Sequence, residues 1–239
     1  MMELRPAAER GLANFGWLHS QHSFSFGSYY DPQHMGFSDL LVINEDRVRQ
    51  GRGFDPHGHR DMEIFSYVLD GALAHKDSMG TGSVIRPGDV QMMSAGTGVR
   101  HSEYNASRDE LVHFLQIWIM PDRKDVEPRY QQRHFSAEDK RGKLRLIISP
   151  DGADGSLSVY QDARVHAGLF DGDERQRFDL PANRFAYVHV ARGAIELNGQ
   201  RLGAGDAVKL RNARELEFAR GDKAEVLLFD LRPNETPHY

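Results

Sequence analysis

The chain has 239 residues, a formal net charge of -5 and no cysteine, which excludes disulfides, thiolate metal sites and cysteine nucleophiles. The pI of about 6.2 lacks the basic excess with which proteins grip a nucleic-acid backbone, so we expect no direct contact with DNA or RNA. No apolar run approaches the ~18 residues of a membrane helix, and the N-terminus does not resemble a signal peptide. These features predict a cytoplasmic protein without membrane contact.

Short apolar segments separated by glycine-containing turns predict an all-β chain of the sandwich or barrel class. In the first half we expect strands over 39–44, 63–69, 72–78, 89–95 and 111–120. Residues 121–143 are charged and show no alternation, so we interpret them as a linker with one helical turn near Ser136–Lys140. Strands are expected again over 143–149, 156–162, 184–192, 194–199, 206–210, 215–219 and 225–231.

A weak internal repeat predicts two related β-barrels. Both halves contain strand, glycine, strand, Gly-Asp and strand, first around Gly71 and then around Gly193. We therefore predict an N-terminal barrel over 1–120, a linker over 121–143 and a degenerate C-terminal barrel over 144–239. The histidines of the first half have no counterparts in the second, so any metal site is expected to be single and N-terminal.

Two pairs of potential metal ligands stand out. Side chains two apart on a strand share a face, so His57, His59 and Glu63 line one face if a strand begins before them. His101 and Glu103 do the same on a later strand. Imidazoles and carboxylates suit first-row divalent metals, and three imidazoles with one carboxylate leave coordination positions open for catalysis. The spacing alone does not decide whether Glu63 or Glu103 is the carboxylate ligand.

Methionine and histidine side chains on the predicted strands are further candidates for a site. One of the two methionines at 92 and 93 must face the barrel interior, and we predict that Met92 lines the pocket. His75 and His189 lie on strands without partners, and we interpret both as structural. His113 alternates with Phe114, and we interpret it as a packed or surface histidine.

The spacing of these residues resembles the first motif of the cupins, G-x5-H-x-H-x3,4-E-x6-G. Gly51, His57, His59 and Glu63 fit the motif, and the closing glycine, Gly71, comes one residue late. The second cupin motif ends in H-x3-N, which His101 and Asn105 match, although Ser94-Ala95-Gly96 replaces its P-x-G.

Within the cupins, the chain resembles a bacterial pirin. The segments that carry this resemblance include NFGWLHSQHSFSFGSYYDP (14–32), HGHRDMEIFSYVLDG (57–71) and SAGTGVRHSEYN (94–105). The likeness is specific over the N-terminal two-thirds and covers the C-terminal third only as a degenerate barrel. It implies a bicupin, with two jelly-roll barrels in one chain and one metal in the first barrel.

The resemblance also implies a ligand set and an activity. The pirin ligands fall at His57, His59, His101 and Glu103, with Glu63 beside them, hydrogen-bonded to a ligand or the substrate. One divalent transition metal is implied, with Fe(II) favoured, while Ni, Co, Mn, Cu and Zn suit the same donors. Several pirins are quercetin 2,3-dioxygenases, which cleave flavonols with O2. In such a reaction Glu103 would be both ligand and proton acceptor.

The alternative function is a metal- or redox-sensing regulator that acts through protein partners. A surface loop around Arg123–Arg133 would offer a docking surface, although charged loops are usually only solvated. We expect a monomer, because a bicupin already covers much of its sheet edge internally.

Overall fold

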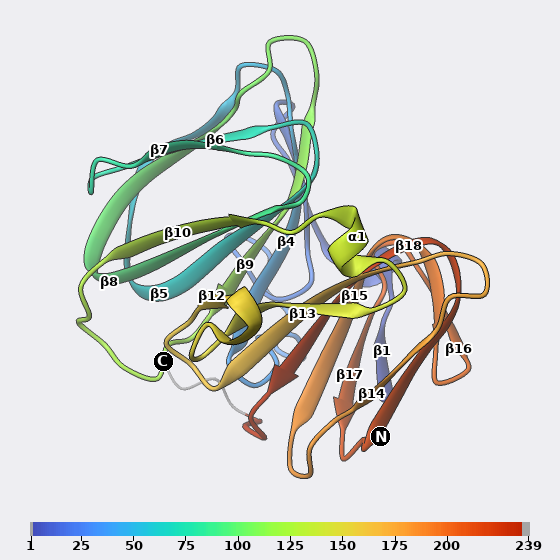
Figure 1. Ribbon diagram of the computed structural model, residues 1–239. Coiled ribbons are helices and arrows are strands. Elements are labelled where there is room, and N and C mark those ends of the chain that lie inside the picture. The colour runs from blue at the N-terminus through green and yellow to red at the C-terminus, as the bar shows by residue number, and fades with distance from the viewer. Residues whose placement is uncertain (1, 236–239) are drawn as a thin grey trace.

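The computed structural model describes residues 2–235 and confirms the all-β bicupin architecture (Figure 1). Within these residues the strands form two nine-stranded sheets. The first contains β2 (Gly11–Asn14), β3 (Leu18–His22), β4 (Leu40–Val48), β5 (Gly53–Asp70), β6 (Leu73–Asp77), β7 (Gly82–Ile85), β8 (Asp89–Asn105), β9 (Val112–Ile119) and β10 (Arg129–His134). The second contains β1 (Met2–Arg5), β11 (Leu144–Ser149), β12 (Leu157–Ser158), β13 (Ala163–Phe170), β14 (Gln176–Asp179), β15 (Phe185–Leu197), β16 (Gln200–Gly203), β17 (Ala207–Arg211) and β18 (Glu215–Leu231).

The first strand belongs to the sheet of the C-terminal half. β1 pairs antiparallel with β17, and Figure 1 shows the blue N-terminal strand beside the orange strands. The short 3-10 helix η1 (Ala7–Glu9) then leads the chain to β2 in the other sheet. Arg5, which is buried, donates from Nε to the carbonyl oxygen of Ser23 at 3.2 Å and so ties this crossing to the N-terminal barrel.

The segment 121–143 carries ordered structure of its own. The helical turn expected near Ser136–Lys140 is confirmed as α1 (Ala137–Lys140), in which Ser136 and Asp139 form a reciprocal capping box. The segment also contains β10, which pairs antiparallel with β8 over six residues. This strand was not predicted, because RYQQRH lacks the alternation of apolar and polar residues.

Several strands are much longer than the apolar runs suggested. β5 has 18 residues and β8 has 17, because both continue through polar segments that carry the histidines. The break expected at Gly193 is wrong: β15 runs through this residue, whose φ of +63° accompanies a shift in register against β18. Bulges of this kind bend a strand without ending it.

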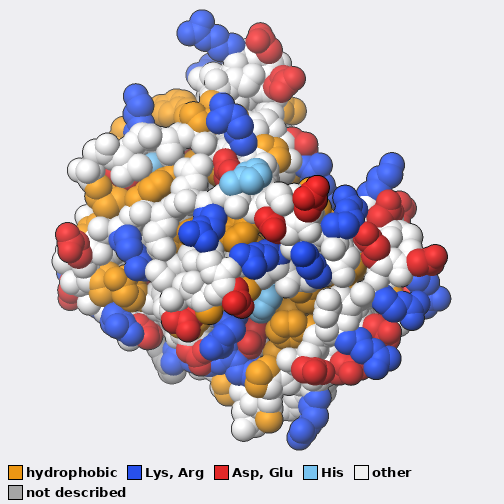
Figure 2. Space-filling view, in the orientation of Figure 1, with side chains coloured by type: hydrophobic (Ala, Val, Ile, Leu, Met, Phe, Trp, Pro, Cys, Tyr) orange, Lys and Arg blue, Asp and Glu red, His pale blue; other side chains and the backbone are white. Residues whose placement is uncertain are grey.

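The two barrels share one hydrophobic core. Phe65 and Met92 of the first sheet belong to the same buried cluster as Tyr187 and Phe229 of the second. The ring centroids of Phe65 and Phe229 lie 6.4 Å apart. On the face shown in Figure 2, basic and acidic side chains are interspersed over both barrels. Across residues 2–235, no helix has the length and apolarity needed to cross a membrane.

Candidate metal centre

Three imidazoles converge inside the N-terminal barrel. His57 on β5 lies directly opposite His101 on β8, and His59 follows two residues later. The Nε2 atom of His101 lies 3.0 Å from that of His57 and 3.1 Å from that of His59. Adjacent nitrogen ligands of an octahedral ion with ~2.1 Å bonds are ~3.0 Å apart. The nitrogen of His101 therefore already has the spacing of a neighbouring ligand in such a shell to each of the other two.

The surroundings favour the neutral form of His59 and His101 and orient His57. The Nδ1 atom of His57 lies 2.8 Å from the backbone carbonyl oxygen of Asp55, so its proton is held there and Nε2 is left with a free lone pair. Burial lowers the pKa of His59 to about 4, assisted by the nearby His57. Burial likewise lowers the pKa of His101, and the neighbouring histidines add to this effect. Neutral imidazole is the form that binds a metal.

Glu103 lies beside the histidines. Its Oε2 atom is 3.9 Å from Nε2 of His101, and the side chain is buried. Ser66 donates to Oε1 at 3.3 Å, and Gln116 donates to Oε2 at 3.5 Å. Burial, followed by repulsion from Asp46, raises the pKa of Glu103 to about 7. A bound cation would act in the opposite direction and favour the carboxylate form.

The structure places Glu63 elsewhere, and a bulge is the reason. The register of β5 against β8 shifts between His59 and Asp61, and Asp61 has a φ of +63°. At this irregularity the alternation of faces along β5 reverses, so Glu63 points away from His57 and His59. Its Oε2 atom accepts hydrogen bonds from Ser94 Oγ at 3.1 Å and from the backbone N–H of Tyr160, in the C-terminal half, at 3.2 Å.

Met92 also lies away from the histidines. It is fully buried opposite Phe65 and packs in the core that the two barrels share. Its neighbour Met93 occupies the other face of β8 and packs with Ile64 and Val99 near the histidines. The expectation that one of the two methionines faces the barrel interior holds, but the residue that does so is Met93.

His75 has partners that sequence reasoning missed. It lies directly opposite Glu103 across β6 and β8, and its Nε2 atom is 2.9 Å from Oδ2 of Asp77. His75, His101 and Glu103 form a second group whose potential ligand atoms lie within 4.8 Å of one another. This pairing between strands was invisible in the sequence, because the register of β6 against β8 could not be read from spacing within either strand.

A small cavity of about 70 Å³ opens beside His57, His59 and Glu103. Its wall combines aromatic rings with polar groups from β4, β5, β8 and β9: Phe26, Asn44, Asp46, Phe54, His57, His59, Glu103, Phe114, Gln116 and Trp118. Sequence reasoning missed Asn44, Asp46 and Gln116. The available signal was the polar pair at 44 and 46, which share one face at the end of an apolar strand.

Both halves of the chain match known protein families, and known relatives match nearly its full length. Residues 4–119 match the Pirin family model, and residues 146–231 match the model of the quercetinase C-terminal cupin domain. A quercetin 2,3-dioxygenase of Escherichia coli (strain K12) is 46% identical over 233 residues, which cover 98% of this chain and 100% of that protein. A pirin-like protein of Caulobacter vibrioides is 38% identical, with 96% of this chain and 99% of that protein covered.

Solved structures lead to the same family. The bacterial pirin YhhW from Escherichia coli, solved in complex with nickel(II), superposes with a TM-score of 0.93 at 45% identity. The match covers 98% of this chain and 100% of that one. With identity at this level over nearly the full length of both chains, the chain belongs to the pirin family.

Proposed function

We propose that this protein is a metal-dependent quercetin 2,3-dioxygenase, with His57, His59, His101 and Glu103 as the metal ligands. The observation that carries the proposal is the convergence of three imidazole nitrogens, two pairs of which lie 3.0 and 3.1 Å apart. Lone pairs directed at one point repel one another unless a cation or proton lies between them. The name of the similar Escherichia coli protein supports the choice of substrate.

The donor set fits a divalent transition metal with open positions. Three nitrogens and one oxygen suit Fe, Ni, Co, Mn, Cu or Zn, and we propose Fe(II) as the resident ion. Nickel(II), which the similar bacterial pirin contains, is the first alternative. When bound, such an ion would supply Lewis acidity toward the flavonol hydroxyl and a site for O2.

Glu103 is proposed to accept the proton of the flavonol hydroxyl. Its carboxylate is buried within reach of the ligand set, and Ser66 and Gln116 fix its orientation through hydrogen bonds. Groups held this way are already aligned for proton transfer. The Trp118 ring lies 5.0 Å from that of His59 and offers an apolar wall for a flat polyphenol.

The cavity must widen before it can admit such a substrate. Its volume of about 70 Å³ is well below the ~300 Å³ at which small-molecule pockets begin. Phe26, Phe54 and Trp118 are partly exposed at the mouth, and movement of these rings would enlarge the opening. We therefore expect substrate to enter past aromatic side chains, which would also shield the reaction from water.

The test is quercetin consumption with and without metal and O2. We expect turnover and carbon monoxide release in air, loss of both under nitrogen or after chelation, and recovery with one added ion. Turnover that survives complete metal removal would refute the proposed chemistry. Stoichiometric metal without flavonol turnover would favour the regulatory alternative. The expected monomeric state and cytoplasmic location stay predictions.

A ligand variant connects this assay to the proposed site. His101→Ala should abolish both metal binding and turnover, because it removes the imidazole that touches both other histidines. His134→Ala is a matched control, since this side chain is 62% exposed on β10, where it pairs with Asp89. Retained turnover in His101→Ala would place the reaction elsewhere.

A further inference from the structure

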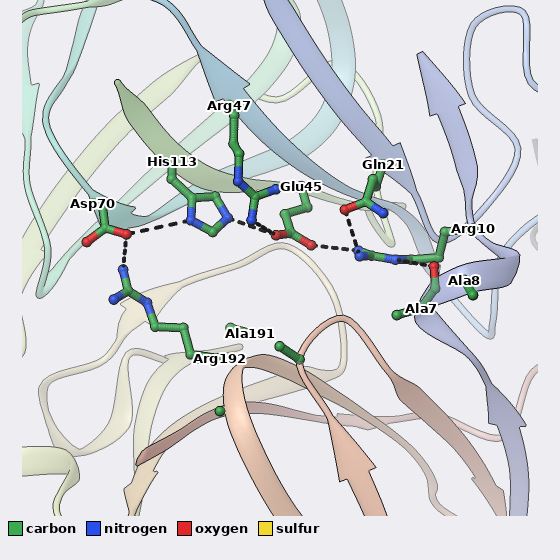
Figure 3. Close-up of a pocket in the computed structure, with 12 residues that line it drawn as sticks. Ala7, Ala8, Arg10, Gln21, Glu45, Arg47, Asp70, His113, Ala191 and Arg192 are labelled. Atoms are coloured by element: carbon green, nitrogen blue, oxygen red, sulfur yellow. Dashed lines mark hydrogen bonds and ion pairs between the residues drawn. The ribbon is translucent and has the colours of Figure 1, made fainter. Parts of the chain in front are cut away.

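A second and larger cleft lies between the two barrels. Its volume is about 540 Å³, within the range of small-molecule sites, which favour boundaries between domains. Figure 3 shows charged side chains in a row along the N-terminal barrel, with Arg192 extending toward them from the C-terminal barrel. Small residues make up much of the remaining wall: Ala7, Ala8, Ala191, Gly193 and Ala204.

The cleft is separate from the metal centre, although both use the same two strands. On β4, Asn44 and Asp46 face the metal pocket, whereas Glu45 and Arg47 face the cleft. On β9, His113 lines the cleft, while the next residue lines the metal pocket. The alternation of faces along a strand therefore places the two cavities back to back.

The carboxylate of Glu45 already contacts three basic side chains. Arg10 and Arg47 each approach it to 2.8 Å, and His113 lies 2.9 Å from Oε1. These contacts, partly offset by burial, lower the pKa of Glu45 far below its ordinary range. Glu45 is therefore already paired and offers little to a ligand. A ligand in the cleft would contact the outer side of Arg47, whose side chain is 38% exposed.

The opposite wall contributes a second guanidinium. Arg192 is 36% exposed and contacts Asp70, with Nη2 2.6 Å from Oδ2. Asp70 is itself 62% exposed, so solvent weakens this pair. In the part of the chain that the structure describes, Arg192 Nη2 and Arg10 Nη1 lie beside carboxylates without well-aligned hydrogen bonds. Poorly aligned donors of this kind form stronger hydrogen bonds when they turn toward a better-placed acceptor.

Three guanidinium groups line the cleft, and Arg192 lies 3.6 Å from Glu225 in addition to its contact with Asp70. We propose that this cleft binds a small oxyanion, a carboxylate or a phosphate, between Arg47 and Arg192. Guanidinium groups form paired hydrogen bonds with both kinds of anion. The alanine and glycine walls leave room for the body of the ligand.

Isothermal titration of the full-length, metal-loaded protein with succinate and with inorganic phosphate tests this proposal. We expect saturable binding of at least one, with a Kd near or below the millimolar range, and the preferred anion identifies the source class. Arg47→Gln and Arg192→Gln should each weaken binding at least tenfold. Arg177→Gln, which removes a positive charge on distant β14, should change it less than twofold.

Two outcomes would overturn the proposal. One is the absence of saturable binding for both anions. The other is binding that neither arginine variant in the cleft weakens more than the Arg177→Gln control, which would place the anion elsewhere, including on the metal. Because the variants lie on opposite walls, each with a partly exposed side chain, a folding defect in one leaves the other as a test.

Discussion

Glu63 and Glu103 show how local geometry gives two similar side chains different surroundings. Both are buried, and burial raises the pKa of each to about 7. Glu103 lies 3.9 Å from the converging imidazole of His101. Glu63 lies where the barrels meet, hydrogen-bonded to Ser94 and to the amide of Tyr160. Burial of a carboxyl group is thus a poor guide to catalysis unless its neighbours are known.

Glutamine substitutions should distinguish Glu103, the proposed proton acceptor, from Glu63, which lies where the barrels meet. Glu103→Gln should reduce kcat by about 10²- to 10⁴-fold even at saturating metal, because it removes the proposed proton acceptor. Glu63→Gln should leave metal content and kcat close to the wild-type values. Metal analysis and quercetin kinetics on both variants check this. Equal losses in the two variants would contradict the assignment of Glu103.

The raised pKa of Glu63 also predicts a dependence of stability on pH. The folded protein keeps this proton up to about pH 7, whereas the unfolded chain releases it near its ordinary value of 4.5. The unfolded state therefore binds fewer protons in this window, and the free energy of unfolding should fall as the pH rises through it. The contribution is at most about 3 kcal/mol.

Urea unfolding of wild type and Glu63→Gln at pH 5 and pH 7.5 measures this contribution. The variant should lose less stability than the wild type between the two pH values, since its side chain does not ionise. Parallel losses in the two proteins would show that Glu63 is not the group responsible.

The sequence predicted the residues of the proposed ligand set but not all of their neighbours. His57, His59, His101 and Glu103 were found because they are close along the chain and match a known spacing. The structure brings them together, which supports their assignment without testing it. The position of His75 opposite Glu103 depends on how β6 and β8 align, and pairing between strands leaves little trace in either strand alone.

At the scale of the strand, the β-bulge between β5 and β8 at Asp61 decides which residues face the site. Asp61 adopts a φ of +63°, and its Oδ1 atom accepts a hydrogen bond from the backbone N–H of Asp125 at 2.7 Å. Without this bulge, the simple alternation expected from the sequence would have put Glu63 on the face of the histidines. Nothing in the composition of this segment distinguishes a bulge from a regular strand.

Substitutions at Asp61 test the importance of this conformation. Asp61→Val should lower the free energy of unfolding by about 1–2 kcal/mol, because a β-branched residue tolerates positive φ poorly. Asp61→Asn should stay close to wild type, since asparagine accepts this conformation and can keep the contact with Asp125. Urea denaturation compares them. A valine variant as stable as the asparagine variant would mean that the strand does not need the bulge.

At the scale of the whole molecule, the shared core makes the two barrels a single unit. The repeat in the sequence predicted two barrels, but not that aromatic residues of both would pack together, since amphipathic strands do not specify their partner. Phe229 contacts Phe65 of the other barrel and Tyr187 of its own, with ring centroids 6.4 and 6.1 Å apart. We therefore expect the chain to unfold in one transition.

Phe229→Ala tests this cooperativity. The loss of a buried ring should lower the stability by about 3–5 kcal/mol. Both tryptophans, Trp17 and Trp118, lie in the N-terminal half, so their fluorescence reports that barrel alone. In Phe229→Ala, the unfolding midpoints measured by tryptophan fluorescence and by circular dichroism should fall together. Phe15→Ala is the control, at a residue that is 65% exposed, and should change neither midpoint. A variant in which only circular dichroism shifts would show that the barrels unfold independently.

The central claim is that one metal ion is held by His57, His59, His101 and Glu103. The most direct measurement is an anomalous difference map from crystals of the metal-loaded protein, collected at the absorption edge of the metal found by elemental analysis. The account predicts a single strong peak within bonding distance of the three Nε2 atoms and one carboxylate oxygen of Glu103. A peak at another group of residues, or a fully occupied ion that Glu103 does not touch, would contradict it.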